Sequence, residues 1–338
     1  MRLIFCLTFL VSFKSLGVAF PGPKDFAVNG CRIFDAYQVE RKVLPGERCI
    51  FLNNGDFIAS NTGTIRYFTA RDEIKWTVKG VFHHQLNLTT DKNRILAIGS
   101  VLGSLEQEEP KRYDQLLVIG MDGKVLQTMD MHTALVGVNT RFPPMHNPFK
   151  SEINVPFEGS HVNSFYEIPP LKKGVKVPSY AQPGNYIINS LALGVLFIDK
   201  DLKKILATWV SPYATRHNTH DAQITTEGKL IYFNNLSANS ANGNYHSTID
   251  EVDLMTKQRT LEIKSNPGVY FYSRNCGGVQ VLNDDLIMFS HVIVGYYVYS
   301  RATKSIIYSG NAPFAVGERL VTAQQIKIMD LTEFLKNR

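Results

Sequence analysis

Short apolar runs separated by polar turns recur along most of the chain. Each run has the length of a β-strand, is rich in Val, Ile, Tyr and Phe, and is bounded by Asn, Asp or Gly. A strand, a polar turn and a second apolar strand can be read at residues 52–59, 89–97, 225–232 and 282–288. Helical periodicity is confined to a short stretch at 330–336. The pattern predicts an all-β protein built from hairpins.

A second hairpin follows the first in each repeat. Its copies lie at residues 64–76, 117–126, 195–206, 249–258 and 297–306. Two hairpins form a four-stranded antiparallel sheet, which is one blade of a β-propeller. Five blades fit between residues 49 and 309, and a sixth would join a strand near 320–329 to an N-terminal strand at 30–43.

Closing the ring with both termini leaves no open sheet edge. A β-sandwich is the alternative all-β fold, but it does not predict a recurring pair of hairpins. We therefore expect a β-propeller of six four-stranded blades, closed by the N- and C-terminal strands.

The first twenty residues differ from the rest. Arg2 precedes an apolar run at 3–13, and small residues follow before a Pro-Gly-Pro sequence. This is the layout of a secretory signal peptide, and the run is too short to span a bilayer. We expect residues 1–20 to be a signal peptide and residues 21–338 to form a single propeller domain, exported to a periplasm or secreted, with no membrane span.

Composition narrows the range of partners. Of the 338 residues, 44% are hydrophobic and 20% are charged, which suits a large folded core and excludes a disordered chain. The formal net charge is +6, but the cations form no Lys/Arg block. We therefore expect no nucleic-acid partner.

Export would expose the chain to two covalent modifications. Beyond the leader, the cysteines are Cys31, Cys49 and Cys276. Because Cys31 and Cys49 both lie in the N-terminal region, we expect them to pair and Cys276 to be a free thiol. No CxxC motif supports zinc or redox chemistry. Asn87 and Asn235 begin glycosylation signals, which are read only in a eukaryotic host.

Three histidines recur at one place in the repeat. His84 and His220 precede the first hairpin turn of their units, and His161 with Asn163 occupies the same region of the intervening unit. Because the first strand of each blade lines the channel, equivalent positions converge on the axis. We expect these four residues to form a site at one channel mouth, with Asp221 alongside. We expect the side chain of His83 to point away from that of His84, because neighbouring strand residues face opposite ways. The remaining histidines are expected to be structural or on the surface: His132, His146, His217, His246 and His291.

Three kinds of chemistry fit three convergent imidazoles. Three histidines and a water can form a catalytic zinc site. Alternatively, one neutral imidazole acts as a nucleophile while the others stabilise developing negative charge, and the Asp221 carboxylate could hold a histidine tautomer if it folds back. The third interpretation is a non-catalytic propeller that binds an anion.

Several of these segments resemble the arylsulfotransferase family of exported bacterial propeller enzymes. The similar segments are HHQ at 83–85, SHVNS at 160–164, THDA at 219–222, NGCRIFD at 29–35, YIINS at 186–190 and VLFID at 195–199. They are short, but their order and spacing run through most of the chain beyond the leader. The resemblance implies transfer of a sulfuryl group from a phenolic sulfate ester to a phenol through a sulfated histidine, with no cofactor or metal.

The resemblance also assigns roles. It implies that His220 is the nucleophile, and that His84, His161 and Asn163 bind the sulfuryl oxygens. The alternatives are a metal-dependent hydrolase on the same three histidines and a propeller that binds anions without catalysis.

The chain departs from the family at one position. The family has an arginine in the segment matching residues 187–191, where this chain has Ser190 and its neighbours. Arg216 and Arg274 are the candidates to supply that cation.

Overall fold

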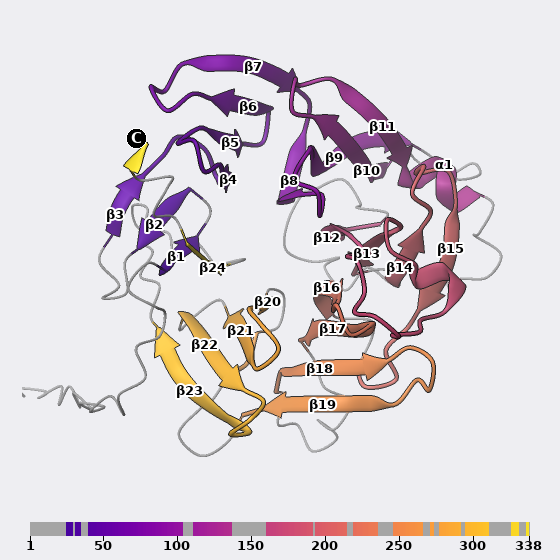
Figure 1. The fold of residues 1–338 in the computed structure, drawn as a ribbon. Coiled ribbons are helices and arrows are strands. Elements are labelled where there is room, and N and C mark those ends of the chain that lie inside the picture. Colours follow the sequence, from indigo (N-terminus) through magenta and orange to yellow (C-terminus); the bar gives the residue numbers. More distant parts are fainter. Residues whose placement is uncertain are drawn as a thin grey trace, which may run out of the picture.

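Six four-stranded antiparallel sheets make up the computed structural model of the protein (Figure 1). The structure describes residues 25–29, 31–34, 40–103, 111–136, 160–191, 193–214, 219–235, 246–265, 271–273, 277–291, 295–310, 326–330 and 336–337. The predicted fold class, a β-propeller of six four-stranded blades, is confirmed. The expected signal peptide and most of the expected C-terminal helix lie outside the described residues. Among the residues that are described, no helix is long and apolar enough to cross a membrane.

Five blades follow one another in sequence. Blade 1 comprises β4 (Arg48–Phe51), β5 (Phe57–Ser60), β6 (Thr64–Phe68) and β7 (Ile74–Lys79). Blade 2 comprises β8 (Phe82–Leu88), β9 (Arg94–Gly103), β10 (Lys111–Gly120) and β11 (Val125–Asp130), after which comes the helix α1 (Met131–Val136). Blade 3 comprises β12 (Val162–Glu167), β13 (Tyr186–Ser190), β14 (Gly194–Ile198) and β15 (Ile205–Trp209), with the 3-10 turn η2 (Ser179–Ala181) between its first two strands.

The remaining blades complete the ring. Blade 4 comprises β16 (Thr219–Ile224), β17 (Lys229–Asn234), β18 (Thr248–Asp253) and β19 (Arg259–Lys264). Blade 5 comprises β20 (Gly278–Val281), β21 (Leu286–His291), β22 (Gly295–Ser300) and β23 (Ser305–Gly310). Blade 6 comprises β24 (Ile326–Asp330), β1 (Asp25–Asn29), β2 (Arg32–Phe34) and β3 (Glu40–Val43).

Burial follows the position of a strand within its blade. The first strands face the centre of the ring, and β4, β8, β12, β16 and β20 contact one another in succession (Figure 1). Middle strands such as β5, β13, β14 and β22 are buried along their whole length. The fourth strands β7 and β23 alternate between exposed and covered positions. Middle strands are covered on both faces, and this explains their continuous apolar runs.

The core is divided into layers between neighbouring blades. Successive side chains of a strand point to opposite faces of the sheet, so each middle strand contributes to two layers. In β9, Ile95 and Ala97 pack against blade 1, whereas Leu96 and Ile98 pack against blade 3. In β17, Tyr232 packs towards blade 3 and Phe233 towards blade 5 in the same way. Each blade therefore depends on both neighbours for its core.

The termini close the ring in blade 6. Strand β24 pairs with β1 in antiparallel register, with Ala27 opposite Ile328. The predicted union of both ends is confirmed, but the N-terminal segment contributes three strands to this blade rather than one.

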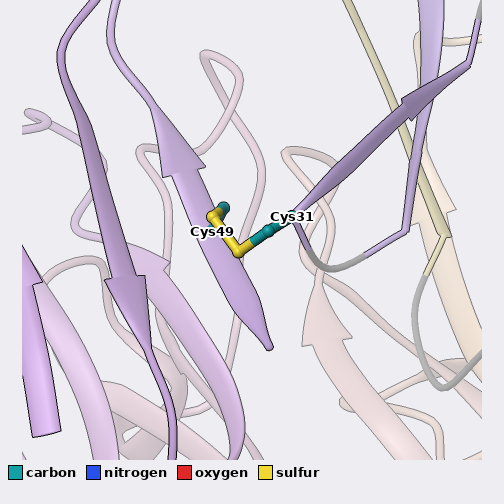
Figure 2. The surroundings of a disulfide bond; sticks show 2 residues. All are labelled: Cys31 and Cys49. Atoms are coloured by element: carbon teal, nitrogen blue, oxygen red, sulfur yellow. A yellow bond between two sulfur atoms is a disulfide. The ribbon is translucent and has the colours of Figure 1, made fainter. Parts of the chain in front are cut away.

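A disulfide joins blade 6 to blade 1, between Cys31 in the turn before β2 and Cys49 in β4 (Figure 2). This is the predicted cysteine pair, while Cys276 lies outside the described residues. Gly46 packs beside it with a φ of +120°, and a Cβ there would lie 2.8 Å from the Ala59 Cβ. The backbone approaches this closely only because residue 46 is glycine.

The repeat also predicts equivalent places for the two tryptophans near the ends of fourth strands. Both lie on fourth strands, but Trp76 is opposite Tyr67 in blade 1 and Trp209 is opposite Val195 in blade 3. Aligning the two pairings places Trp76 at the position of Ala207, two residues before Trp209. The expectation of equivalence is therefore wrong.

The disulfide gives a prediction about stability. The two cysteines are 18 residues apart in the sequence, and the cross-link restricts the unfolded chain. For a loop of this length, we expect replacement of both cysteines by alanine to lower the free energy of unfolding by about 3 kcal/mol. Urea unfolding of the Cys31→Ala, Cys49→Ala double variant and of the unaltered protein measures this loss. Reductant should destabilise only the unaltered protein, and equal midpoints without reductant would contradict the prediction.

Candidate active site

The first strands of three consecutive blades are irregular near the predicted histidines. Their pairing with the second strand shifts register between Phe82 and Leu86 in β8, between Val162 and Ser164 in β12, and between His220 and Gln223 in β16. Such bulges bend a strand and redirect its side chains.

Backbone angles at the same level are unusual for residues other than glycine. The φ values are +54° at His84, +44° at His161 and +56° at Asp221. A left-handed conformation costs a residue with a Cβ about 1 kcal/mol or more, and such residues cluster at functional sites. Three blades therefore carry backbone strain where their side chains meet.

The structure brings three predicted histidines together from three blades. The ring centroids of His84 and His161 lie 5.1 Å apart with the planes tilted by 58°. The buried His220 is close enough for its charge to act on His84. The Arg48 guanidinium, on the first strand of blade 1, acts on His84 as well.

His84 is held as a neutral imidazole. Its side chain is only partly exposed, and its pKa lies well below 6.5. Burial is the largest cause of this shift, because it disfavours the charged form. The positive charges around it lower the pKa further, those of His83, His161, His220 and Arg48. Among the described residues none donates a hydrogen bond to this ring or accepts one from it. At pH 7 it can therefore give one N–H to an anion.

His220 is bound by an amide. Its Nδ1 lies 2.7 Å from the Asn235 Oδ1, and the Asn235 Nδ2 donates to the Ser273 carbonyl at 2.7 Å. The partner of Nδ1 is therefore Asn235 and not the Asp221 carboxylate that the sequence suggested.

Asp221 instead joins four blades near the middle of the ring. Its Oδ1 accepts hydrogen bonds from the Gln85 Nε2 at 2.6 Å and the Tyr166 hydroxyl at 2.5 Å. Its Oδ2 accepts from the Val279 N–H at 2.8 Å. Burial and the neighbouring Asp221 carboxylate raise the pKa of Tyr166 well above its usual value, so the phenol keeps its proton. Because Gln85 and Asp221 follow His84 and His220 by one residue, this network fixes the strands that carry the imidazoles.

Asn163, and not His161, is the repeat equivalent of His84 and His220. His84 and His220 lie five residues before Thr89 and Thr225, whose N–H groups close the first hairpin turns. In blade 3 the closing N–H belongs to Ile168, and five residues before it is Asn163. The register expected for His161 was therefore wrong by two residues. The bulge in β12 follows His161 and lets its ring reach the cluster all the same.

The buried Asn163 amide is partly committed to the fold. Its Nδ2 donates to the Thr219 carbonyl at 3.1 Å, and its buried Oδ1 has no hydrogen-bond partner among the described residues. One N–H of the amide remains available for an oxygen atom of a ligand.

His83 belongs to the surroundings of this cluster rather than to a separate surface. Its ring centroid lies 4.8 Å from that of His84, and its Nε2 lies 2.9 Å from the Asp114 Oδ1. The Asp114 Oδ2 accepts from the Val162 N–H at 2.7 Å, next to His161. Asp114 thus links the two strands that carry these histidines.

The other histidines were expected to be structural or on the surface. His132 in α1 packs against Tyr113, with ring centroids 5.2 Å apart. His146 and His217 lie outside the described residues, as does the side chain of His291.

The guanidinium whose charge acts on His84 belongs to a residue that the sequence did not single out, Arg48, whose Nη1 also lies 3.2 Å from the Glu47 Oε2. Arg216 and Arg274 lie outside the described residues. Ser190 is fully buried, and its Oγ donates to the Ser160 carbonyl. Arg48 follows Glu47, which lies five residues before Leu52, whose N–H closes the first hairpin turn of blade 1. Glu47 is therefore the repeat equivalent of His84 and His220, and the register carried a signal for its neighbour.

Metal coordination is not favoured by the arrangement of donors. The described part of the chain contains no group of three or more His, Cys, Asp or Glu side chains placed to hold a metal ion. The cluster is better suited to binding an anion, because it combines three imidazoles with one guanidinium.

These features define the class: a six-bladed propeller with imidazoles from three blades gathered at its centre. No family model matches the sequence, and no curated protein matches it. A protein of unknown function from Bacteroides caccae is similar in structure, with a TM-score of 0.51 and 12% identity over 85% of this chain and 93% of that one. At that identity the likeness supports the fold alone. The dihydro-heme d1 dehydrogenase NirN has a TM-score of 0.42 and 11% identity, and 83% of this chain covers 52% of it.

The depressed pKa of His84 predicts a loss of stability in mild acid. Below pH 6.5 the unfolded chain binds a proton at this residue while the folded protein does not, so stability falls as the pH falls. The slope approaches about 1.4 kcal/mol per pH unit, the value for one proton. Urea unfolding between pH 7.5 and 5, compared with His84→Gln, measures this contribution. If the free energies of unfolding of the two proteins differ by the same amount at every pH, the contribution of His84 is contradicted.

Proposed function

We propose that the protein is an arylsulfotransferase-like enzyme, which moves a sulfuryl group from a phenolic sulfate ester to a phenol through a sulfated His220. The observation that carries the proposal is the meeting of His84, His161 and His220 beside the Arg48 guanidinium. This supplies a nucleophile and several positive or hydrogen-bonding groups for the oxygens of one anion. The signal peptide expected at the N-terminus and the disulfide fit an exported enzyme.

The first step would form the covalent intermediate. The lone pair on the His220 Nε2 attacks the sulfur atom, an N–S bond forms, and the S–O bond to the aryl group breaks. The electron pair of that bond leaves with the phenolate. His84, His161, Asn163 and Arg48 would hold the sulfuryl oxygens.

The second step would regenerate the ring. The acceptor phenol gives its proton to the phenolate released in the first step, directly or through water, and its oxygen attacks sulfur. The N–S bond then breaks and its electron pair returns to the His220 Nε2. No cofactor is required, because the sulfuryl group passes from the oxygen of one phenol to the oxygen of another by way of His220.

The alternative of a non-catalytic propeller that binds anions rests on the same groups. The guanidinium and the imidazoles suit binding of an anion as well as transfer of a sulfuryl group. The strained backbone at His84 and His161 supports a functional site of either kind, because such strain occurs at ligand clamps and at active sites.

Replacement of His220 should separate these possibilities. We expect His220→Asn to reduce turnover of a chromogenic aryl sulfate with phenol to background, because the nucleophile is lost. Asn163→Ala removes one donor and should cost roughly 10²–10³ in rate. Donor alone should add about 80 Da to the His220 peptide, the mass of a sulfuryl group on a covalent intermediate.

A chelator should leave the activity unchanged, whereas a metal-dependent hydrolase would lose it. An aryl sulfate that binds without turnover would identify a binding propeller. Turnover without a label on His220 would refute the sulfated-histidine intermediate.

Arg48 should act through its charge. We expect Arg48→Met to lower kcat/KM for the aryl sulfate by roughly 10²-fold, the scale for loss of one group that stabilises the transition state, and Arg48→Lys to restore part of it. Arg71→Met, at an exposed position in a turn of the same blade, is the matched control and should leave the rate unchanged. Equal rates for Arg48→Met and the control would exclude this role.

A further inference from the structure

A chain of buried hydrogen bonds leads to the His220 ring. The Asn235 Nδ2 donates to the Ser273 carbonyl, and the Asn235 Oδ1 faces the His220 Nδ1, both at 2.7 Å. A carbonyl oxygen can only accept, so it determines which end of the amide carries hydrogen. The amide oxygen is thereby turned towards the ring. Nδ1 must then carry the proton, and the neutral ring has its lone pair on Nε2.

The Asn235 amide is itself fixed by its surroundings. The Ser247 Oγ donates to the Asn235 backbone carbonyl at 3.0 Å and accepts from the Ser273 N–H at 2.9 Å. Asn235 and Ser247 are both fully buried. The amide therefore cannot turn over without breaking buried hydrogen bonds, which is costly where no water replaces them.

The other two blades of the cluster lack this amide. Asn235 lies six residues after Lys229, whose carbonyl closes the first hairpin turn of blade 4. The same count from the turn-closing carbonyls of Arg94 and Asn185 reaches Ser100 in blade 2 and Leu191 in blade 3. The Ser100 Oγ is buried and makes no hydrogen bond to the described residues. Of these three blades, only the blade of His220 carries an asparagine at this position.

We propose that Asn235 is a positioning residue that sets the tautomer of His220 and so directs the Nε2 lone pair to the substrate. The inference rests on the proposed function. When Nε2 bonds to sulfur, the ring becomes positively charged and its Nδ1–H becomes a stronger donor. The hydrogen bond to Asn235 therefore stabilises the intermediate more than the free enzyme, which is the condition for raising kcat.

The test compares three variants in the full-length protein labelled with ¹⁵N-histidine. Asn235→Leu removes the acceptor at similar size, Asn235→Asp keeps an acceptor but loses the donor to Ser273, and Ser100→Ala is the matched control from blade 2. We expect ¹⁵N NMR to show the proton of His220 on Nδ1 in the unaltered protein and in the control. In Asn235→Leu the proton should move to Nε2.

Turnover of the aryl sulfate should follow the tautomer. Asn235→Leu should lower kcat by roughly 10- to 100-fold with little change in KM, the scale for loss of a residue that orients a ligand-binding histidine. Asn235→Asp should retain much of kcat. Because its carboxylate favours the imidazolium, the acid limb of its pH–rate profile should move to higher pH. A purely structural role for Asn235 would leave the tautomer of His220 unchanged in Asn235→Leu.

A second readout does not depend on sulfuryl transfer. Inorganic phosphoramidate phosphorylates histidine: the ring nitrogen forms an N–P bond, the P–N bond of the reagent breaks, and ammonia leaves. We expect ³¹P NMR to show modification of the His220 Nε2 in the unaltered protein and much slower modification in Asn235→Leu.

The two proposals can fail separately. A protein without turnover but with the Nδ1–H tautomer and this difference in phosphorylation would refute the proposed function and leave Asn235 in its role. If Asn235→Leu is folded, as urea unfolding would show, and its His220 keeps both the tautomer and the reactivity, the role of Asn235 is refuted. A proton on Nε2 in the unaltered protein would refute it as well.

Discussion

Each middle strand divides its side chains between two apolar layers, one on either side of its blade. The rest of the ring depends on this constraint. Leu96 and Ile98 face one neighbour while Ile95 and Ala97 face the other, so blade 2 has no core of its own. A blade at an open end of such a row would expose one apolar face to water at roughly 25 cal/mol per Å². The ring must therefore close, and the strand pairing and the disulfide of blade 6 serve that closure.

The same constraint gives the candidate site its rigidity. The packed layers fix the spacing of the first strands, and Asp221 ties four of them through hydrogen bonds. Strained backbone at His84 and His161 persists because the surrounding structure leaves these residues no alternative. The imidazoles of His84 and His161 are thus held beside one another before any ligand arrives, which is the preorganisation that charge stabilisation requires.

The sequence predicted those features that depend on local repetition. Paired hairpins implied four-stranded blades, and five blades bounded by two unmatched ends implied closure by the termini. Features that depend on contacts across strands were harder to predict. The offset of His161 from the repeat register appears only when residues are counted from the N–H that closes each first hairpin turn, and in blade 3 that N–H belongs to Ile168.

Two residues of the site show what the sequence repeat can and cannot predict. Arg48 stands beside the position that the repeat aligned, yet its approach to His84 depends on how blades 1 and 2 pack. Asn235 directly follows β17, the strand opposite His220, and lies two residues beyond the partner Phe233, so correct pairing would have located it. The sequence alone could not show which histidine that amide would orient. The activity implied by the family resemblance is likewise a matter for experiment.

The burial of Asn235 and Asn87 has a consequence for producing the protein. Both residues begin glycosylation signals, and their exposed fractions are 0% and 4%. A secretory pathway that attaches oligosaccharides to the unfolded chain would place a bulky polar group where the folded protein has no space. On Asn235 the sugar would also take the amide nitrogen that donates to Ser273. A bacterial expression host avoids this conflict, and in a eukaryotic host the substitution Ser237→Ala would remove the signal at Asn235 without changing that side chain.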